Sequence, residues 1–190
     1  MNISMSKDEQ EPWHVTRSER GPALPLFQVR FDRVRNPRNG HHMKAVILEA
    51  DDWVNVVAIT PEEKVVVVRQ YRFGTRRMTV EIPAGIVEAG ETPKEAAIRE
   101  LREETGYAAR EWRYLGYVEP NPAFMDNACH NWLAVDASQV QRPNLDAGED
   151  IRVGEMSKEE LRREIKAGRL RHSLALVALA QVFDLWPDPA

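Results

Sequence analysis

Short runs of hydrophobic residues, many of them β-branched, recur along the first half of the chain between turn-forming residues. Two runs, 26–35 and 43–49, flank the segment 36–40, whose Asn, Pro and Gly residues are typical of a tight turn. Two further runs, 54–60 and 64–71, are also separated by a short turn. The pattern predicts two β-hairpins, and the first of them would form a small antiparallel sheet ahead of the main domain.

The second half of the chain alternates strand-like runs with helical segments. The runs predict strands at 78–82, 112–119, 130–135 and 151–155. Ser157 and Glu160 form a capping box that begins a helix ended by Gly168, and apolar residues predict a last helix over 173–185. Strands interleaved with a few helices favour an α/β fold with a mixed β-sheet between helices.

One helix, between Gly85 and Tyr107, has clear sequence signals for both its start and its end. Thr92 has the character of an N-cap, and Glu95 completes a capping box with it. Gly106 stands where a helix ends in a left-handed residue. The sequence therefore predicts a loop followed by a helix of about 13 residues.

Carboxylates crowd one face of this predicted helix. Glu100, Glu103 and Glu104 are spaced i, i+3 and i+4, so they share a face, and Ile98 and Leu101 are expected to be buried on the opposite side. Unpaired, such carboxylates weaken a helix by several tenths of a kcal/mol per pair. A divalent cation reverses the sign of that interaction, and oxygen ligands without nearby Cys or His favour Mg²⁺ or Mn²⁺ over zinc.

The spacing of these residues resembles the signature of the Nudix family. It reads Gly85-x5-Glu91-x7-Arg99-Glu100-Leu101-x-Glu103-Glu104-x-Gly106-Tyr107, and every fixed position is matched. The last position is usually aliphatic in the family and is aromatic here. The resemblance covers roughly residues 45–185 and implies a Nudix-type α/β/α sandwich with a mixed β-sheet, which agrees with the strand and helix pattern.

By this resemblance the chain is expected to hydrolyse a nucleoside diphosphate linked to another group. Water attacks one phosphorus of the P–O–P bridge while divalent cations offset the developing charge. The metal ligands would be the Ala84 carbonyl and the carboxylates of Glu100, Glu103 and Glu104, with Mg²⁺ as the cofactor and Mn²⁺ as its substitute. Arg99 would orient the glutamates or contact a phosphate.

Features outside the helix resemble the family branch that hydrolyses ADP-ribose and nucleotide sugars. By that resemblance Arg72 reaches the substrate diphosphate, and Pro122 stands where this branch carries a proline. Ala123 follows it in place of a glycine, so a broader nucleotide-sugar preference is as well supported as strict ADP-ribose specificity. Four arginines precede the helix within nine residues, and they predict either an anion clamp or a solvated strand edge: Arg69, Arg72, Arg76 and Arg77.

The general base is assigned by the same resemblance to Glu149, in the acidic segment 148–151, and Asp150 and Glu103 stay open as alternatives. Two other functions also stay open. One is a house-cleaning hydrolase of free or oxidised nucleotides or other dinucleotides. The other is an ADP-ribose-sensing module without turnover, which the complete set of helix glutamates disfavours.

Length and composition set the remaining expectations. The 190 residues fit a disordered tail (1–12), an N-terminal β-hairpin extension that mediates dimerisation (13–50) and a Nudix hydrolase domain (51–187), with a frayed end at 187–190. The net charge of −4 argues against nucleic acid as a partner. No long apolar run or secretory signal is seen, and the lone Cys129 is expected to be a small strand residue. These features predict a cytoplasmic homodimer acting on a small molecule, with no membrane partner.

Overall fold

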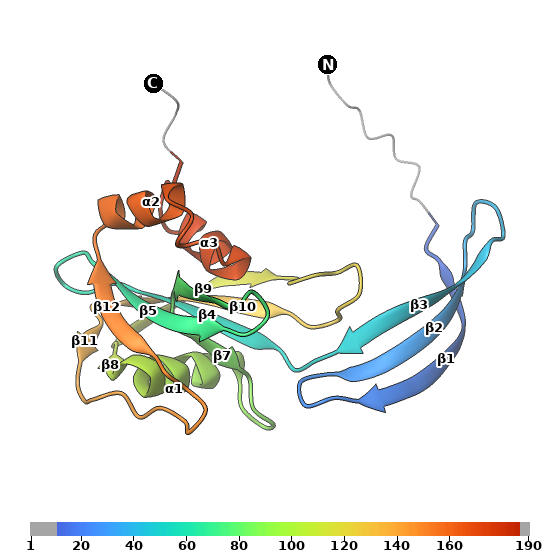
Figure 1. Cartoon of the computed structure of the whole chain (residues 1–190), viewed down its shortest axis with the longest axis horizontal. Coiled ribbons are helices and arrows are strands. Elements are labelled where there is room, and N and C mark those ends of the chain that lie inside the picture. The colour runs from blue at the N-terminus through green and yellow to red at the C-terminus, as the bar shows by residue number, and fades with distance from the viewer. Residues whose placement is uncertain (1–10, 187–190) are drawn as a thin grey trace, which may run out of the picture. The chain divides into compact units, whose positions relative to one another are not determined.

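The computed structural model describes residues 11–186 of the chain (Figure 1). The chain divides into two compact units. One unit extends to Ala50 and includes Asn121–Asp126, and the other contains Asp51–Pro120 and the residues from Asn127 onward. The predicted disorder at 1–12 and fraying at 187–190 fall almost entirely outside the described residues.

The first unit is a three-stranded antiparallel sheet in the order β1-β2-β3. Its strands are β1 (His14–Ala23), β2 (Gln28–Arg35) and β3 (His42–Glu49). β2 and β3 form the predicted N-terminal hairpin, and Gly40 in their turn has a φ of 73°, which favours glycine. The sequence pattern does not predict β1, because most of its side chains are polar and exposed, so no regular alternation marks it.

The second unit contains two main sheets (Figure 1). The larger has the order β7-β4-β10-β9, with β4 and β10 parallel and the other pairs antiparallel. Its strands are β4 (Trp53–Ala58), β7 (Ala84–Ile86), β9 (Glu111–Val118) and β10 (Cys129–Val135). The smaller is antiparallel in the order β12-β5-β6, made of β5 (Val65–Arg72), β6 (Arg77–Glu81) and β12 (Arg152–Met156). A short pair joins β8 (Tyr107–Ala108) and β11 (Ser138–Gln139). The four strands predicted in the second half of the chain are confirmed.

Helices cover both sides of these sheets (Figure 1). They are α1 (Pro93–Thr105) on one side and α2 (Lys158–Lys166) and α3 (Ser173–Ala180) on the other. Val66 belongs to the hydrophobic cluster that includes Leu101 of α1, whereas its neighbour Val67 packs in the cluster that includes Leu161 of α2. This alternation confirms the predicted α/β/α sandwich with a mixed sheet. None of the helices in residues 11–186 has the length and hydrophobicity needed to cross a bilayer.

The predicted hairpin of 54–60 with 64–71 forms only next to its turn, where Ile59 and Val65 make an isolated antiparallel bridge. A turn does form, since the Thr60 N–H donates to the Lys64 carbonyl at 2.8 Å, but β4 and β5 belong to different sheets. β4 pairs with β7 on one edge and with β10 on the other, so neither edge is left for β5. The last helix also ends earlier than predicted, and Leu185 reaches the core from an irregular segment beyond it.

Candidate catalytic site

The helix α1 begins and ends where its sequence predicts. The Thr92 hydroxyl accepts a hydrogen bond from the Glu95 N–H at 3.3 Å, and the Glu95 carboxylate accepts one from the Thr92 N–H at 2.8 Å. Gly106 ends the helix with a φ of 74°, and a Cβ there would lie 2.1 Å from the Gln141 carbonyl oxygen. Only glycine fits that position, so the helix is fixed at both ends.

The carboxylate face of α1 is turned further inward than predicted. Ile98 is 41% exposed, which corrects the expectation that it is buried, whereas Glu104 is only 3% exposed. Ala97, Leu101 and Glu104 follow one another at i+4 and i+3, so a helix that buries Leu101 also buries Glu104. One of the proposed metal ligands therefore lies within the protein interior.

Arg99 is the centre of an ion-pair cluster on this helix. Its Nε and Nη2 atoms donate to the Glu91 carboxylate at 3.0 and 2.9 Å, and its Nη1 atom donates to Glu100 at 2.7 Å and to Glu103 at 3.2 Å. Nη2 also donates to the Ile86 carbonyl at 2.9 Å, which ties the helix to β7. These hydrogen bonds, above all those to Glu91, raise the pKa of Arg99 above its usual value. Arg99 thus forms ion pairs with three carboxylates, those of Glu91, Glu100 and Glu103.

Glu104 is buried and Glu100 is partly buried, and the negative charges of the two acids oppose each other. Burial raises the pKa of Glu104 to about 8, with further contributions from the charges of Glu100 and Glu149, against a 3.0 Å hydrogen bond from the Ala84 N–H. Burial likewise raises the pKa of Glu100 to about 7, and Arg99 only partly opposes this. Two neighbouring carboxylates that are hard to ionise in the interior favour a bound cation.

Gly85 allows the Glu100 carboxylate to approach β7. A Cβ at Gly85 would lie 1.9 Å from Glu100 Oε1 and 2.0 Å from its Cδ. No side chain can stand between them while Glu100 keeps this position. The glycine of the signature therefore makes room for a carboxylate.

Arg72 is held by a buried glutamate that the sequence analysis did not select. Its Nε and Nη2 atoms donate to the Glu81 carboxylate at 2.9 and 2.7 Å, and the Thr79 hydroxyl donates to Glu81 at 2.6 Å. Burial alone would raise the pKa of Glu81, but the hydrogen bonds from Arg72 and Thr79 outweigh it and hold that pKa below its usual value. His172 Nδ1 lies 3.7 Å from the same carboxylate. The acid within the predicted strand 78–82 was the available signal for this pair.

Glu149 and Pro122 are placed differently by the structure. Glu149 is exposed in the loop before β12, accepts a hydrogen bond from the Asp146 N–H at 3.0 Å, and lies close enough for its charge to raise the pKa values of Glu100 and Glu104. Pro122 is exposed and belongs to the unit formed by the N-terminal sheet. The structure thus brings Glu149 near the carboxylates of Glu100 and Glu104. Pro122 belongs to the unit that contains the N-terminal sheet, not to the unit that contains these acids.

The donor atoms of this site fit a hard divalent cation. They are carboxylate oxygens and, at Ala84, a main-chain carbonyl, with no sulfur or imidazole among them. Within residues 11–186, no three His, Cys, Asp or Glu side chains converge into a ready-made ligand set. The reason is visible in the contacts, because Glu103 is directed to Arg99 and Glu104 to the Ala84 N–H. Two observations therefore support a divalent cation at this site. The available donor atoms are oxygens, and a cation would relieve the repulsion between Glu100 and Glu104.

Comparison with known proteins gives consistent matches. The model of the NUDIX domain matches residues 51–177. The chain is 36% identical over 155 residues to the methanol dehydrogenase activator of Bacillus methanolicus, covering 81% of this chain and 83% of that protein. It is 36% identical over 147 residues to the ADP-ribose pyrophosphatase of Bacillus subtilis (strain 168), covering 77% and 73% of the two chains. A crystal structure of an ADP compounds hydrolase shares the fold, with a TM-score of 0.79 at 20% identity over 90% of this chain and 92% of that one.

Proposed function

The chain belongs to the Nudix family, and from this premise we propose that it hydrolyses the bridged diphosphate of a nucleoside diphosphate linked to a sugar. ADP-ribose and nucleotide sugars are the proposed substrates, and a nucleoside monophosphate and a sugar phosphate are the products. The observation that carries the proposal is the pairing of partly buried Glu100 with buried Glu104 on one face of α1, with pKa values raised to about 7 and 8. Buried acids with strongly shifted pKa values are typical of functional sites.

Nudix hydrolases generally use divalent metal ions, and we propose Mg²⁺ for this chain, with Mn²⁺ as a substitute. The Ala84 carbonyl and the carboxylates of Glu100, Glu103 and Glu104 would hold it. When bound, the cation offsets the negative charge that develops on the phosphates during hydrolysis. Glu103 is the most accessible of the three acids, with 42% of its side chain exposed, so it can leave Arg99 at little cost.

Arg72 is proposed to bind the substrate diphosphate. Glu81 occupies its Nε and Nη2 donors, which fixes the plane of the guanidinium group, and 40% of the Arg72 side chain remains exposed. A guanidinium group has five N–H donors, so Arg72 retains donors for a phosphate oxygen. Glu81 therefore acts as a positioning residue for Arg72.

Glu149 is proposed as the general base that takes a proton from the attacking water. It is exposed and lies near the buried acids, as the raised pKa values of Glu100 and Glu104 indicate. Glu103 is the alternative base. The proposed roles of Pro122 in substrate binding and of Arg99 at a phosphate rest on family resemblance.

We further propose a homodimer formed through the N-terminal sheet. Val29 is the one hydrophobic residue in the described part of this segment that is fully buried, whereas Val15, Met43 and Val46 are 57%, 46% and 49% exposed. A small sheet with so little interior gains stability from a partner. A monomer in size-exclusion chromatography with light scattering at micromolar concentration would contradict this.

A reducing, cytoplasmic location is proposed from the single cysteine of the chain. Cys129 is buried in β10 and unpaired, and burial raises the pKa of its thiol to about 12. This confirms its expected role as a small strand residue. A protein without disulfides suits a reducing compartment, and fractionation of the source cells would test the location.

A substrate panel tests the proposed activity directly. ADP-ribose, ADP-glucose, UDP-glucose, GDP-mannose, NAD⁺ and nucleoside triphosphates would each be incubated with Mg²⁺ and with Mn²⁺ in H₂¹⁸O, and the products identified by mass spectrometry. The expected products are a nucleoside monophosphate and a sugar phosphate, one of them carrying ¹⁸O. Pyrophosphate released from triphosphates would instead indicate the house-cleaning function. Tight ADP-ribose binding without turnover would indicate a sensing module.

A further inference from the structure

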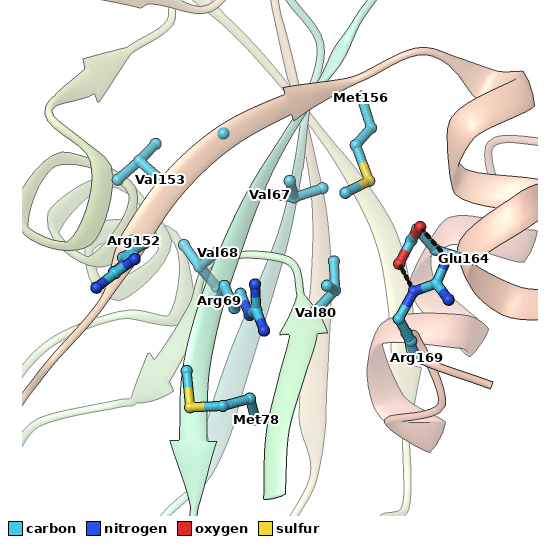
Figure 2. A pocket seen from close by; sticks show the side chains of 11 residues that line it. Val67, Val68, Arg69, Met78, Val80, Arg152, Val153, Met156, Glu164 and Arg169 are labelled. Atoms are coloured by element: carbon cyan, nitrogen blue, oxygen red, sulfur yellow. Dashed lines mark hydrogen bonds and ion pairs between the residues drawn. The ribbon is translucent and has the colours of Figure 1, made fainter. Parts of the chain in front are cut away.

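A pocket lies on the β12-β5-β6 sheet (Figure 2). It is on the face opposite to Arg72 and Glu81. Arg69 of β5 is paired in register with Arg152 of β12 on one side and with Val80 of β6 on the other, so these three residues share a face. Successive strand residues alternate between faces, and therefore Arg72 and Glu81 are directed away from this pocket. The pocket is separate from the candidate catalytic site.

The floor of the pocket is apolar and its volume suits a small molecule. The volume is about 500 Å³, within the usual range of ligand sites of roughly 300–1,000 Å³. Val67 and Val80 line its floor, with Met78 and Met156 at its margins (Figure 2). Gly154 of β12 leaves space above Val67, because the nearest atom to a Cβ built there is a Val67 methyl carbon at 3.7 Å.

The polar part of the pocket carries unbalanced positive charge. Arg169 is neutralised by Glu164, to which it donates two hydrogen bonds of 2.6 and 2.7 Å (Figure 2). Arg69 and Arg152 form no ion pair or side-chain hydrogen bond with any residue in the described part of the chain. Like charges at directly opposite strand positions are destabilising, and they stand here in a protein of net charge −4. Both side chains are exposed, so their guanidinium groups are open to an anion.

We propose that this pocket binds a small organic phosphate that carries an aromatic ring. The phosphoryl group lies at Arg69 and Arg152, because the guanidinium fork matches phosphate oxygens. The ring lies on the apolar floor, where the Met78 and Met156 thioethers make favourable contacts with aromatic groups. The site is non-catalytic, and it does not depend on the proposed hydrolytic function.

Methyl NMR of protein labelled at the methionine methyl groups tests the proposal, with AMP as the probe. The Met78 and Met156 signals report on the pocket, and those of Met43 and Met125, in the other unit, serve as internal references. AMP is expected to shift the first two signals saturably and to leave the references unchanged. Adenosine and inorganic phosphate, which each lack half of the ligand, are expected to bind at least about tenfold more weakly.

Variants separate this pocket from other AMP sites. Arg69→Gln combined with Arg152→Gln should weaken binding by at least about tenfold, whereas Arg110→Gln, at an exposed arginine outside the pocket, should leave it unchanged. Gly154→Leu should block binding by filling the space above Val67.

Glu104→Gln, which removes a proposed metal ligand, should leave the methyl shifts intact, so this test is independent of turnover. Three outcomes would overturn the proposal. They are the absence of shifts at Met78 and Met156, equal affinity in the double arginine variant, and inorganic phosphate binding as tightly as AMP.

Discussion

Replacing Gly85 by alanine displaces a single carboxylate and leaves the backbone unstrained. The added Cβ would lie 1.9 Å from Glu100 Oε1 and 2.0 Å from Glu100 Cδ. Gly85 is not among the glycines with positive φ, so alanine is compatible with its backbone conformation. The overlapping atoms are the end of a flexible side chain, and therefore the carboxylate moves rather than β7 or α1.

The size of the effect follows from these distances. Glu100 must withdraw by at least about 1.5 Å to reach ordinary contact. A misplacement of about 1 Å at a catalytic group costs about 100-fold in rate, so kcat should fall by 100-fold or more. Stability should change little, because the lost 2.7 Å hydrogen bond from Arg99 is offset by relief of a buried charge. We expect a change of about 1 kcal/mol in the free energy of unfolding, equivalent to about 2–4 °C in Tm.

The assay measures kcat on ADP-ribose over a range of Mg²⁺ concentrations, together with Tm. Gly74→Ala is the matched control, because no atom lies within 4 Å of a Cβ at Gly74. In a Glu100→Ala background the Gly85→Ala change should cause no further loss, since the displaced group is absent. Activity within twofold of the unmodified protein, or an equal further loss in the Glu100→Ala background, would refute the reasoning.

The other predictions concern the remaining acids of the site. Glu104→Gln should lower kcat by orders of magnitude with the fold intact, and unchanged Mg²⁺-dependent kinetics would contradict its assignment as a ligand. Glu149→Gln should lower kcat by about 10²–10⁴ in steady-state assays, and a fall of less than about tenfold would place the base elsewhere. Glu81→Gln releases Arg72 and should raise KM for ADP-ribose by about tenfold or more, whereas a loss confined to kcat would argue against a positioning role. Because burial raises the pKa values of Glu100 and Glu104 to about 7 and 8 from 4.5, the metal-free native protein binds more protons than the unfolded chain. The contribution of these two acids to stability in urea should therefore be fully present below about pH 4.5 and decrease by a few kcal/mol as pH rises toward 8, and the absence of this decrease would contradict their burial.

The sequence allows the helix α1 to be predicted because its determinants are local. Thr92 and Glu95 form the capping box within one turn, and Gly106 ends the helix through its own backbone conformation. The spacing of Glu100 and Glu104 follows from helix geometry alone. The predicted capping residues and helix ends are confirmed, because no distant part of the chain decides them.

The features that could not be predicted from the sequence depend on contacts between residues far apart in the chain. β4 pairs in parallel with β10, more than 70 residues later in the chain, so its neighbouring run at β5 misled the hairpin prediction. Little in the sequence distinguishes Glu81 from the other acidic residues, because its partner Arg72 is brought beside it only by the pairing of β5 with β6. The burial of Glu104 likewise depends on how α1 rests on the sheets. Side-chain environment is set by packing across the fold, which a local pattern does not contain.

Arg99 is an internal counterion for the carboxylates of the site, and this bears on whether folding or metal binding comes first. One guanidinium offsets part of the negative charge of Glu91, Glu100 and Glu103, and it holds their carboxylates together without a metal ion. Binding of the proposed metal ion would then replace one cation, the Arg99 guanidinium, by another cation that comes from solution. A divalent ion of the proposed kind would add its charge to a cluster that is already assembled.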